Sequence, residues 1–255
     1  MVSAAHPLLS GDAIVLAGAT GRVGGATLRA LIEHGAAGVI VASRSQEAAQ
    51  RTIDATLDAG QRPRAFAVEA DLTSVEGGEA LARAALTRLG RIDALVSLAG
   101  GGTPFVSIAE STLDDMETSV RNNLHVAYNT VVPALRAMLQ QRTLPEAHSR
   151  GRLVVVTAGS SLDPQPHFGI MGIGKAGVNL LMLAIAREHK ADGIVANAVV
   201  LGTVATEAAH DYLDDADFAA AASPAEVAGV LAFHASDTSS GVNGSLVHLN
   251  AREVD

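Results

Sequence analysis

The chain has 255 residues, of which 48% are hydrophobic and only 3% aromatic, with no tryptophan and no cysteine. The absence of cysteine excludes disulfides, thiolate metal sites and a cysteine nucleophile. The 27 acidic and 18 basic residues give a net charge of −9. This charge argues against nucleic acid as a partner, because the phosphate backbone is also negative.

The composition also limits the cellular setting. The first residues lack the basic start and the long apolar run of a signal peptide. Glycines and charged residues interrupt every long apolar stretch, so no membrane-spanning helix is expected. We therefore expect a cytoplasmic protein with no membrane partner, no metal site and a small-molecule substrate.

Seven short apolar runs recur along the chain and predict seven strands. Most are continuous runs of Val, Ile, Leu and Ala, which is the pattern of strands buried on both faces of a parallel sheet. The expected strands are Ala13–Gly18, Gly38–Ser43, Arg64–Ala70, Ala94–Ala99, Leu153–Thr157, Ile194–Leu201 and Leu246–Asn250.

Helical patterns fill the intervals between these runs, so β and α units alternate along the chain. Such alternation implies right-handed crossovers and an α/β fold, a Rossmann-type doubly wound seven-stranded parallel sheet with helices on both faces. No linker divides the chain, so residues 1–255 are expected to form a single domain. The expected helices are Gly24–His34, Gln46–Ala59, Val75–Leu89, a long segment from Ser111 to about Gln141, and Gly169–His189.

A glycine-rich turn follows the first strand and opens the first helix. Glycines at such a turn let the backbone approach a pyrophosphate, whose charge then meets the N-terminus of the helix. The alternative is a tight turn that binds nothing. The residues expected to bind a dinucleotide here are Gly18, Thr20, Gly21, Arg22, Val23 and Gly24.

The second strand ends at Ser43 and Arg44, where a Rossmann-type site meets the adenosine ribose. An acidic residue there would bind the 2′-hydroxyl of NAD(H), whereas the planar cation of Arg44 suits a 2′-phosphate. Arg22 offers a second positive charge. NADP(H) is therefore favoured over NAD(H), the alternative being that both arginines are solvated surface residues.

The order of these landmarks resembles the classical short-chain dehydrogenases/reductases over nearly the whole chain. Lys175 in Gly-Ile-Gly-Lys-Ala-Gly matches the active-site lysine of that family, and Asn123 in Asn-Asn-Leu matches its helix asparagine. The resemblance implies that both organise the nicotinamide ribose and a water. It also implies cofactor contacts from Asp71, Leu72, Ala99, Gly100, Leu201, Gly202 and Val204.

The chain departs from the family at the residue that donates the proton. The family's tyrosine stands four residues before the lysine, where this sequence has Met171. Neither Tyr128 nor Tyr212 is followed four residues later by lysine, and the family's serine falls on Ala158. Because a thioether has no proton to give, ordinary ketone or alcohol chemistry is expected to be poor.

One loop carries the candidate replacements for the proton donor: Ser160, Asp163 and His167. Histidine suits proton transfer near neutral pH. The alternatives are a surface histidine, a turn-forming aspartate beside Pro164 and a serine that is out of place. Met171 would make the floor of the site apolar, and the short acidic segment 206–223 suggests an open site for a bulky substrate.

Three functions are compatible with this pattern. The first is an NADP(H)-dependent oxidoreductase with a non-standard site, acting on an imine or iminium, an activated alkene or a bulky carbonyl compound. The second is a non-redox enzyme, such as an isomerase, cyclase or lyase. The third is a catalytically silent NADP(H)-binding protein. The resemblance also implies a homodimer or homotetramer.

Overall fold

In the computed structural model, which describes residues 7–211 and 213–250, the strands form one seven-stranded parallel sheet. The strand order is β3-β2-β1-β4-β5-β6-β7, so the chain winds outward in both directions from β1 and β4. This arrangement confirms the predicted doubly wound sheet. The strands are β1 (Ala13–Ala17), β2 (Gly38–Ser43), β3 (Ala65–Glu69), β4 (Ala94–Ser97), β5 (Gly151–Ala158), β6 (Ile194–Leu201) and β7 (Leu246–Leu249).

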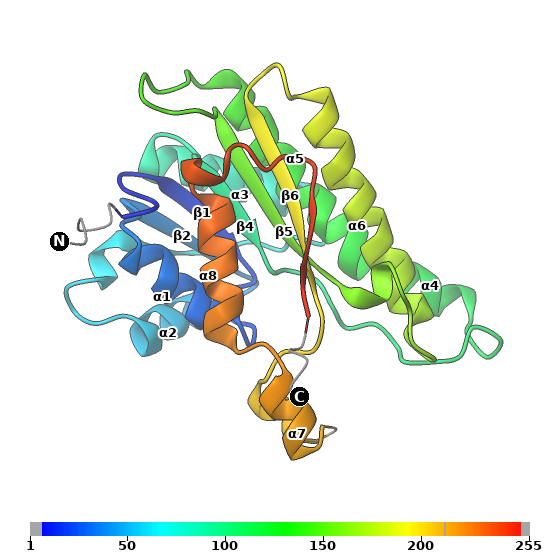
Figure 1. Ribbon diagram of the computed structural model, residues 1–255. Helices are drawn as coiled ribbons and strands as arrows, with labels where there is room; N and C mark the ends of the chain where they lie inside the picture. The colour runs from blue at the N-terminus through cyan, green and yellow to red at the C-terminus, as the bar shows by residue number, and fades with distance from the viewer. Residues whose placement is uncertain (1–6, 212, 251–255) are drawn as a thin grey trace.

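Helices cover both faces of the sheet (Figure 1). One apolar cluster joins the sheet to α1 (Gly24–Glu33), α2 (Gln46–Thr56) and α8 (Pro224–Ala235). A second cluster joins the opposite face to α3 (Val75–Leu89), α5 (Val126–Gln140) and α6 (Gly169–Glu188). Because both faces are covered, β1, β2, β4, β5 and β6 are buried along most of their length, as their apolar residues predict, whereas the edge strands β3 and β7 are only partly buried.

The long helix predicted after Ser111 is divided into three parts. α4 (Leu113–Ser119) begins at Thr112, whose side chain and that of Asp115 form a capping box. A π-helical turn, Val120–His125, then leads into α5 without a break. A π-turn carries an extra residue, which rotates the side chains around it, and such turns are frequent at functional sites.

α8 is not among the helices predicted from the sequence, and residues 206–223 were expected only to form a short acidic segment, which we call the lid segment or lid. α8 begins with a capping box between Ser223 and Glu226 and has Pro224 in its first turn, two start signals that the sequence already carried. The lid segment contains a 3-10 turn, Glu207–Asp211, and the short helix α7 (Asp215–Ala220). Figure 1 shows α7 projecting from the end of the molecule where the strands terminate.

α6 is long and apolar enough to span a membrane, by length and mean hydropathy alone. Half of its most apolar window is buried inside the protein, and the helix packs along β5 and β6. Lys175 lies in its buried face. The apolar character of α6 therefore reflects its place in the core of the fold.

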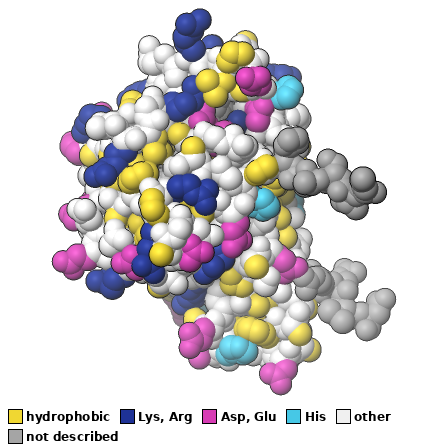
Figure 2. Space-filling view, turned by 90° about the vertical axis from the view of Figure 1, so that its left-hand side faces the viewer, with side chains coloured by type: hydrophobic (Ala, Val, Ile, Leu, Met, Phe, Trp, Pro, Cys, Tyr) yellow, Lys and Arg dark blue, Asp and Glu magenta, His cyan; other side chains and the backbone are white. Residues whose placement is uncertain are grey.

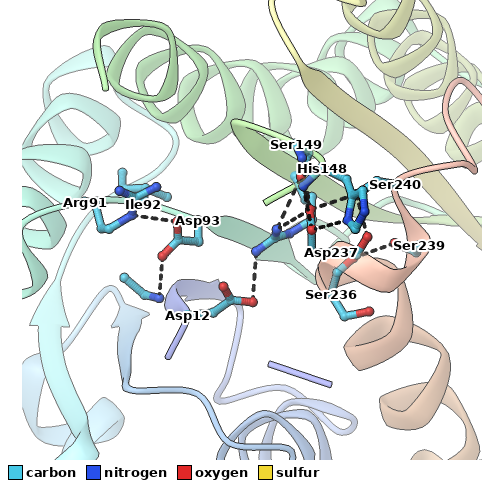
Figure 3. Close-up of polar contacts among 12 residues, drawn as sticks. Asp12, Arg91, Ile92, Asp93, His148, Ser149, Ser236, Asp237, Ser239 and Ser240 are labelled. Atoms are coloured by element: carbon cyan, nitrogen blue, oxygen red, sulfur yellow. Dashed lines mark hydrogen bonds and ion pairs between the residues drawn. The ribbon is translucent and has the colours of Figure 1, made fainter. Parts of the chain in front are cut away.

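The amino-terminal edge of the sheet holds a cluster of charged residues around Arg152. This arginine is 2% exposed, and its guanidinium lies 2.9 Å from Asp12 and 3.3 Å from Asp237. In Figure 3, Asp237 lies among His148, Ser149 and Ser240. Because Asp237 follows α8 and Asp12 precedes β1, the cluster ties distant parts of the chain to the start of β5.

Hydrogen bonds keep Asp237 ionised in this cluster. Burial alone would raise the pKa of its carboxyl. Donors from the backbone and side chain of His148, together with Ser149 and Ser240, outweigh burial and hold that pKa well below its ordinary value. Asp12 shows the opposite balance, because burial raises its pKa more than Arg152 lowers it.

We expect Asp237→Asn to lower the free energy of unfolding by about 2 kcal/mol at pH 7, since it leaves Arg152 buried with less compensating charge. The carboxylate stabilises the fold above its unfolded pKa, and this contribution is lost as pH falls through the lowered folded pKa. The difference between wild type and variant in urea unfolding should therefore shrink between pH 4 and pH 2. Glu79→Gln is the control, because its pair with Arg83 is exposed and worth only a few tenths of a kcal/mol. Equal losses in both variants would contradict a stabilising cluster.

Gly18 closes β1 in a conformation that few other residues adopt. Its φ is 81°, and a methyl group on it would lie 2.7 Å from the backbone nitrogen of Ala99. Gly90, which ends α3, has a similar φ of 79° but nothing within 4 Å of the same position. Comparing substitutions at the two glycines therefore separates the cost of backbone strain from the cost of steric overlap.

Gly90→Ala should cost about 1 kcal/mol of stability, because an L-residue in the left-handed region is strained. Gly18→Ala adds an overlap with the end of β4 and should cost about 3 kcal/mol. Thermal unfolding of the two variants beside the wild type measures the difference. If both lose the same stability, the ends of β1 and β4 are less tightly packed than described.

Candidate functional site

The turn after β1 exposes its backbone at the N-terminus of α1. Thr20, Gly21 and Arg22 are exposed, whereas Val23 is buried and precedes the helix. At Gly24 a side chain would overlap the carbonyl of Ala19, so the helix starts close against the turn. Exposed N–H groups at a helix N-terminus form a binding site for an anion.

The tips of β2 and β3 lie beside this turn. Ser43 is paired with Glu69 across the two strands, and Arg44 follows as an exposed side chain. Hydrogen bonds from Thr73, with a smaller contribution from Arg44, lower the pKa of Asp71. Arg44 and Asp71 are therefore close enough to interact, and a hollow of about 610 Å³ lies next to them along Ser45, Gln46, Glu47, Gln50 and Glu69.

The residues after β4 complete this part of the edge. Ala99 lies against Gly18, and Gly100 follows with a φ of 129°. Leu72 is buried, and its carbonyl accepts a hydrogen bond of 3.1 Å from the Asn129 side chain. The ends of β1, β3 and β4 thus bring the sequence-predicted nucleotide residues of three segments to one edge of the sheet.

Lys175 and Asn123 meet beside Gly100. A methyl group on Gly100 would lie 3.1 Å from both the Lys175 ammonium and the Asn123 carbonyl oxygen. The ammonium also donates a 3.2 Å hydrogen bond to the carbonyl of Val156. Asn123 donates to the carbonyl of Ser119 and to the Thr103 hydroxyl. Two residues that lie 52 positions apart in the chain therefore place their polar groups at one buried site, which we call the polar pocket.

Burial changes the pKa of Lys175 and leaves an oxygen of Asn123 without a hydrogen bond in the described part of the chain. Lys175 is 8% exposed, and burial lowers its pKa to about 8. The Asn123 carbonyl oxygen is buried and accepts no hydrogen bond from any described residue. A buried acceptor beside a partly deprotonated lysine favours a bound donor, such as a water or a hydroxyl of a ligand.

Close helix packing brings these two side chains together. A side chain at Gly174 would lie 2.7 Å from the Ser119 carbonyl, so α6 and the end of α4 are in direct backbone contact. The Ser119 hydroxyl donates a 2.7 Å hydrogen bond to the carbonyl of Ile170. The π-turn follows Ser119 at once and carries Asn123 toward Lys175.

Met171 occupies the turn of α6 before Lys175 and is half-buried. Ala158 ends β5, and Ser160 lies in the short 3-10 turn after it. The Ser160 hydroxyl is buried and has no partner among the described residues. Tyr128 is exposed on α5, and Tyr212 lies outside the described residues.

Asp163 and His167 lie on the exposed loop between β5 and α6. Within residues 7–211 and 213–250, neither side chain has a hydrogen-bond partner. His167 has a φ of 69°, the only positive value among the described residues other than glycine. The structure therefore brings Lys175, Asn123 and Met171 together but leaves Asp163 and His167 on the rim.

The lid borders the remaining side of the edge. Leu201 ends β6, the Gly202 amide donates to the Leu249 carbonyl, and Val204 forms a bridge with Ala222. A hollow of about 590 Å³ separates the glycine turn from the lid and is lined by Arg22, Ala205, Thr206, Glu207, Ala208, Asp211 and Pro224. Arg22, which was predicted from the sequence to bind a dinucleotide, thus lines this hollow.

Sequence reasoning missed Thr103, which orients Asn123, and Asn179, which donates to the Ser161 hydroxyl. Thr103 follows three glycines whose φ values are all positive, a signal for a tightly folded loop. Asn179 lies four residues after Lys175 on α6, one turn away on the same face.

The surface in Figure 2 carries arginines interspersed with acidic and apolar side chains. This face presents no continuous basic surface of the kind that tracks a nucleic-acid backbone. In the described part of the chain, no three His, Asp or Glu side chains gather as ligands for a metal ion.

Comparison with known proteins agrees with this geometry. L-Rhamnose 1-dehydrogenase (NAD(P)(+)) of Sphingomonas sp. strain SKA58 is 30% identical over 93% of this chain and 94% of its own. The (5R,7aS)-5-hydroxy-7a-methyl-1-oxo-2,3,5,6,7,7a-hexahydro-1H-indene-carboxyl-CoA reductase of Mycobacterium tuberculosis is 31% identical over 98% and 95%.

Solved structures give the same result. A short chain dehydrogenase from Mycobacterium smegmatis superposes with a TM-score of 0.81 at 28% identity, covering 98% of this chain and 95% of that one. The crystal structure of gox2181 gives a TM-score of 0.83 at 26% identity, covering 95% of each chain. The sequence model of the short chain dehydrogenases matches residues 12–217. The chain belongs to the short chain dehydrogenase family.

Proposed function

We propose that this protein is an NADP(H)-dependent oxidoreductase whose substrate does not need a phenolic proton donor. The observation that carries the proposal is the buried pocket of Lys175 and Asn123, with Met171 one helical turn away. The pocket keeps the groups that hold a nicotinamide ribose in the family. It lacks the side chain that would protonate a carbonyl oxygen.

The residues fit a nicotinamide dinucleotide. The exposed turn Gly18–Gly24 offers backbone N–H groups to a pyrophosphate. The unpartnered oxygen of Asn123 and the Lys175 ammonium would hold hydroxyl groups through direct bonds or a water. When bound, the dinucleotide supplies or accepts a hydride.

Arg44 supports a preference for NADP(H). Its exposed guanidinium stands at the tip of β2, where it can form charge-assisted hydrogen bonds to a 2′-phosphate. The carboxylate of Glu47 lies 3.9 Å from Arg51, so part of its repulsion toward a phosphate is offset. The relatives named for NAD(P)(+) show that both cofactors occur among similar proteins.

The absence of a phenolic proton donor restricts the class of substrate that the protein could reduce. Reduction of a ketone needs a hydride and a proton, and a positioned acid contributes roughly 10²–10⁴ in rate. An iminium already carries its positive charge, so it needs only the hydride. An activated alkene or a bulky carbonyl compound would take its proton from water, from the buried hydroxyl of Ser160, or from the rim residues Asp163 and His167.

We also propose that the protein forms a homodimer or homotetramer. Large apolar side chains are exposed on α4, α5 and α6, and exposed apolar surface on these helices would be covered in a subunit contact. They are Leu113, Tyr128, Ile173 and Leu180.

Arg44→Ala should weaken NADPH binding about tenfold and change NADH binding by less than about twofold, since only NADPH has the phosphate that Arg44 would bind. Nicotinamide fluorescence measures both affinities, because the chain has no tryptophan to interfere. Arg51→Ala, from the exposed ion pair on α2, is the matched control. Equal weakening of NADPH and NADH would refute the assignment of Arg44 to the 2′-phosphate.

Met171→Tyr tests whether the absent donor limits turnover. With NADPH, the variant should reduce a cyclic ketone about 100-fold faster than the wild type, because it restores a phenol one turn from Lys175. Reduction of a cyclic iminium should not accelerate. Ile173→Tyr adds the same phenol on the exposed side of α6 and is the control. NADPH oxidation at 340 nm follows both reactions.

Other outcomes distinguish the alternatives. Conversion of a substrate without NADPH consumption would favour a non-redox enzyme on this scaffold. Tight NADPH binding with no turnover of imines, activated alkenes or ketones, even in Met171→Tyr, would favour a silent NADP(H)-binding protein. Either result would overturn the proposed oxidoreductase.

A further inference from the structure

Two loops that leave neighbouring strands meet at the carboxyl edge of the sheet. The first runs from the end of β4 to α4, and the second from β5 to α6. The rings of Phe105 and Phe168 lie 4.9 Å apart at an interplanar angle of 59°. Ile108 packs on the start of α6, where a methyl group on Gly169 would lie 3.0 Å from its side chain. The loops therefore touch at two points and form one surface.

This surface is connected directly to the polar pocket. Thr103, two residues before Phe105, accepts a 3.1 Å hydrogen bond from Asn123. Phe168 immediately precedes α6 and stands seven residues before Lys175 on that helix. At 1.5 Å per residue, this separation corresponds to about 10 Å along the helix axis. That length matches a molecule of two or three fused rings.

The surface is apolar and open to solvent. Phe105 is 64% exposed, Ile108 61% and Phe168 38%. An exposed patch of clustered apolar side chains is more often a binding site than the rest of the protein surface is. Aromatic edges and faces at this spacing favour contact with another ring. We define Phe105, Ile108 and Phe168 as the apolar wall.

The charges near the apolar wall argue against an anionic ligand. Neither of its loops, residues 98–112 and 159–168, contains a lysine or an arginine. The Glu110 carboxylate accepts a hydrogen bond from Ser107, and Asp163 adds a second negative charge at the rim. A phosphate or carboxylate on the substrate would find no cation in either loop.

We propose that Phe105 and Phe168 determine specificity by holding the body of a neutral, ring-containing substrate whose reactive C=O or C=N lies at Met171 and Lys175. This inference rests on the proposed function, because it takes Lys175 as the reacting end of the site. The occupant is the substrate itself, since the wall continues into the pocket through Thr103 and Asn123. The exposed apolar residues Leu113 and Leu180 have no such connection.

The test uses ketones that share one carbonyl and differ in apolar size. Calorimetry would measure binding of acetone, cyclohexanone and 2-decalone to the protein, with and without NADPH. We expect 2-decalone to bind at least about tenfold more tightly than acetone, because more apolar area leaves water. Phe105→Ala and Phe168→Ala should each weaken 2-decalone binding about tenfold. Neither should change acetone binding more than about twofold.

Leu180→Ala is the control, because it removes an equally exposed apolar side chain from α6, 68% exposed. It should leave 2-decalone binding unchanged. Affinity that does not rise with ring size, or that is the same in Phe105→Ala and wild type, would overturn the proposal. So would a change in oligomeric state in Phe105→Ala with unchanged 2-decalone affinity, since that result identifies the wall as a subunit contact.

Binding and turnover separate this inference from the proposed function. If binding depends on ring size but no substrate accepts a hydride, the proposed role of the apolar wall is supported and the proposed oxidoreductase function is refuted. If NADPH transfers a hydride at rates and affinities that do not depend on ring size, the oxidoreductase function is supported and the proposed role of the apolar wall is refuted.

Discussion

A parallel sheet that is covered on both faces leaves polar chemistry only at its two edges. Every strand in this protein runs in the same direction, so all carboxyl ends emerge at one edge and all amino ends at the other. The interior holds Ala, Val, Leu and Ile, which cannot carry charge without cost. The charged cluster around Arg152 at one edge and the pocket of Lys175 at the other both follow from this constraint.

Within the carboxyl edge, the position of Lys175 depends on backbone contact between helices. α6 approaches the end of α4 so closely that Gly174 meets the Ser119 carbonyl. The π-turn then presents Asn123 to the same pocket. Burial lowers the pKa of Lys175 to about 8, so near neutral pH the lysine exists in both protonation states.

Much of this fold could be predicted because its strands are buried on both faces. Largely apolar runs such as Ile194–Leu201, interrupted only by Asn197, carry a strong signal, and that strand was predicted to the residue. α8 was missed although Ser223 and Glu226 carry a capping box, because its apolar residues lack a clear helical period. The π-turn has no sequence signal, since an inserted residue in a helix changes hydrogen bonding without changing composition.

The candidate site likewise contains residues that could be assigned from the sequence and contacts that could not. Lys175 and Asn123 were assigned because their motifs resemble those of the family, and the glycine turn because it joins the first strand to the first helix. The partnership of Thr103 with Asn123 and of Phe105 with Phe168 joins residues 20 and 63 positions apart. Such contacts depend on how loops fold over the sheet, and a single sequence records no distance between loops.

The separation of the two edges has a consequence for how this protein can change. Arg152 stands near the start of β5 and Ala158 at its end, so about 20 Å of strand separates the charged cluster from the loops of the apolar wall. Substitutions that far apart combine almost independently. The exposed residues of the apolar wall can therefore vary while the anchoring charges, and the loop residues that contact Gly18 and Asn123, stay fixed. Substitution of a few loop residues could therefore change the substrate preference of this scaffold without any change in its core.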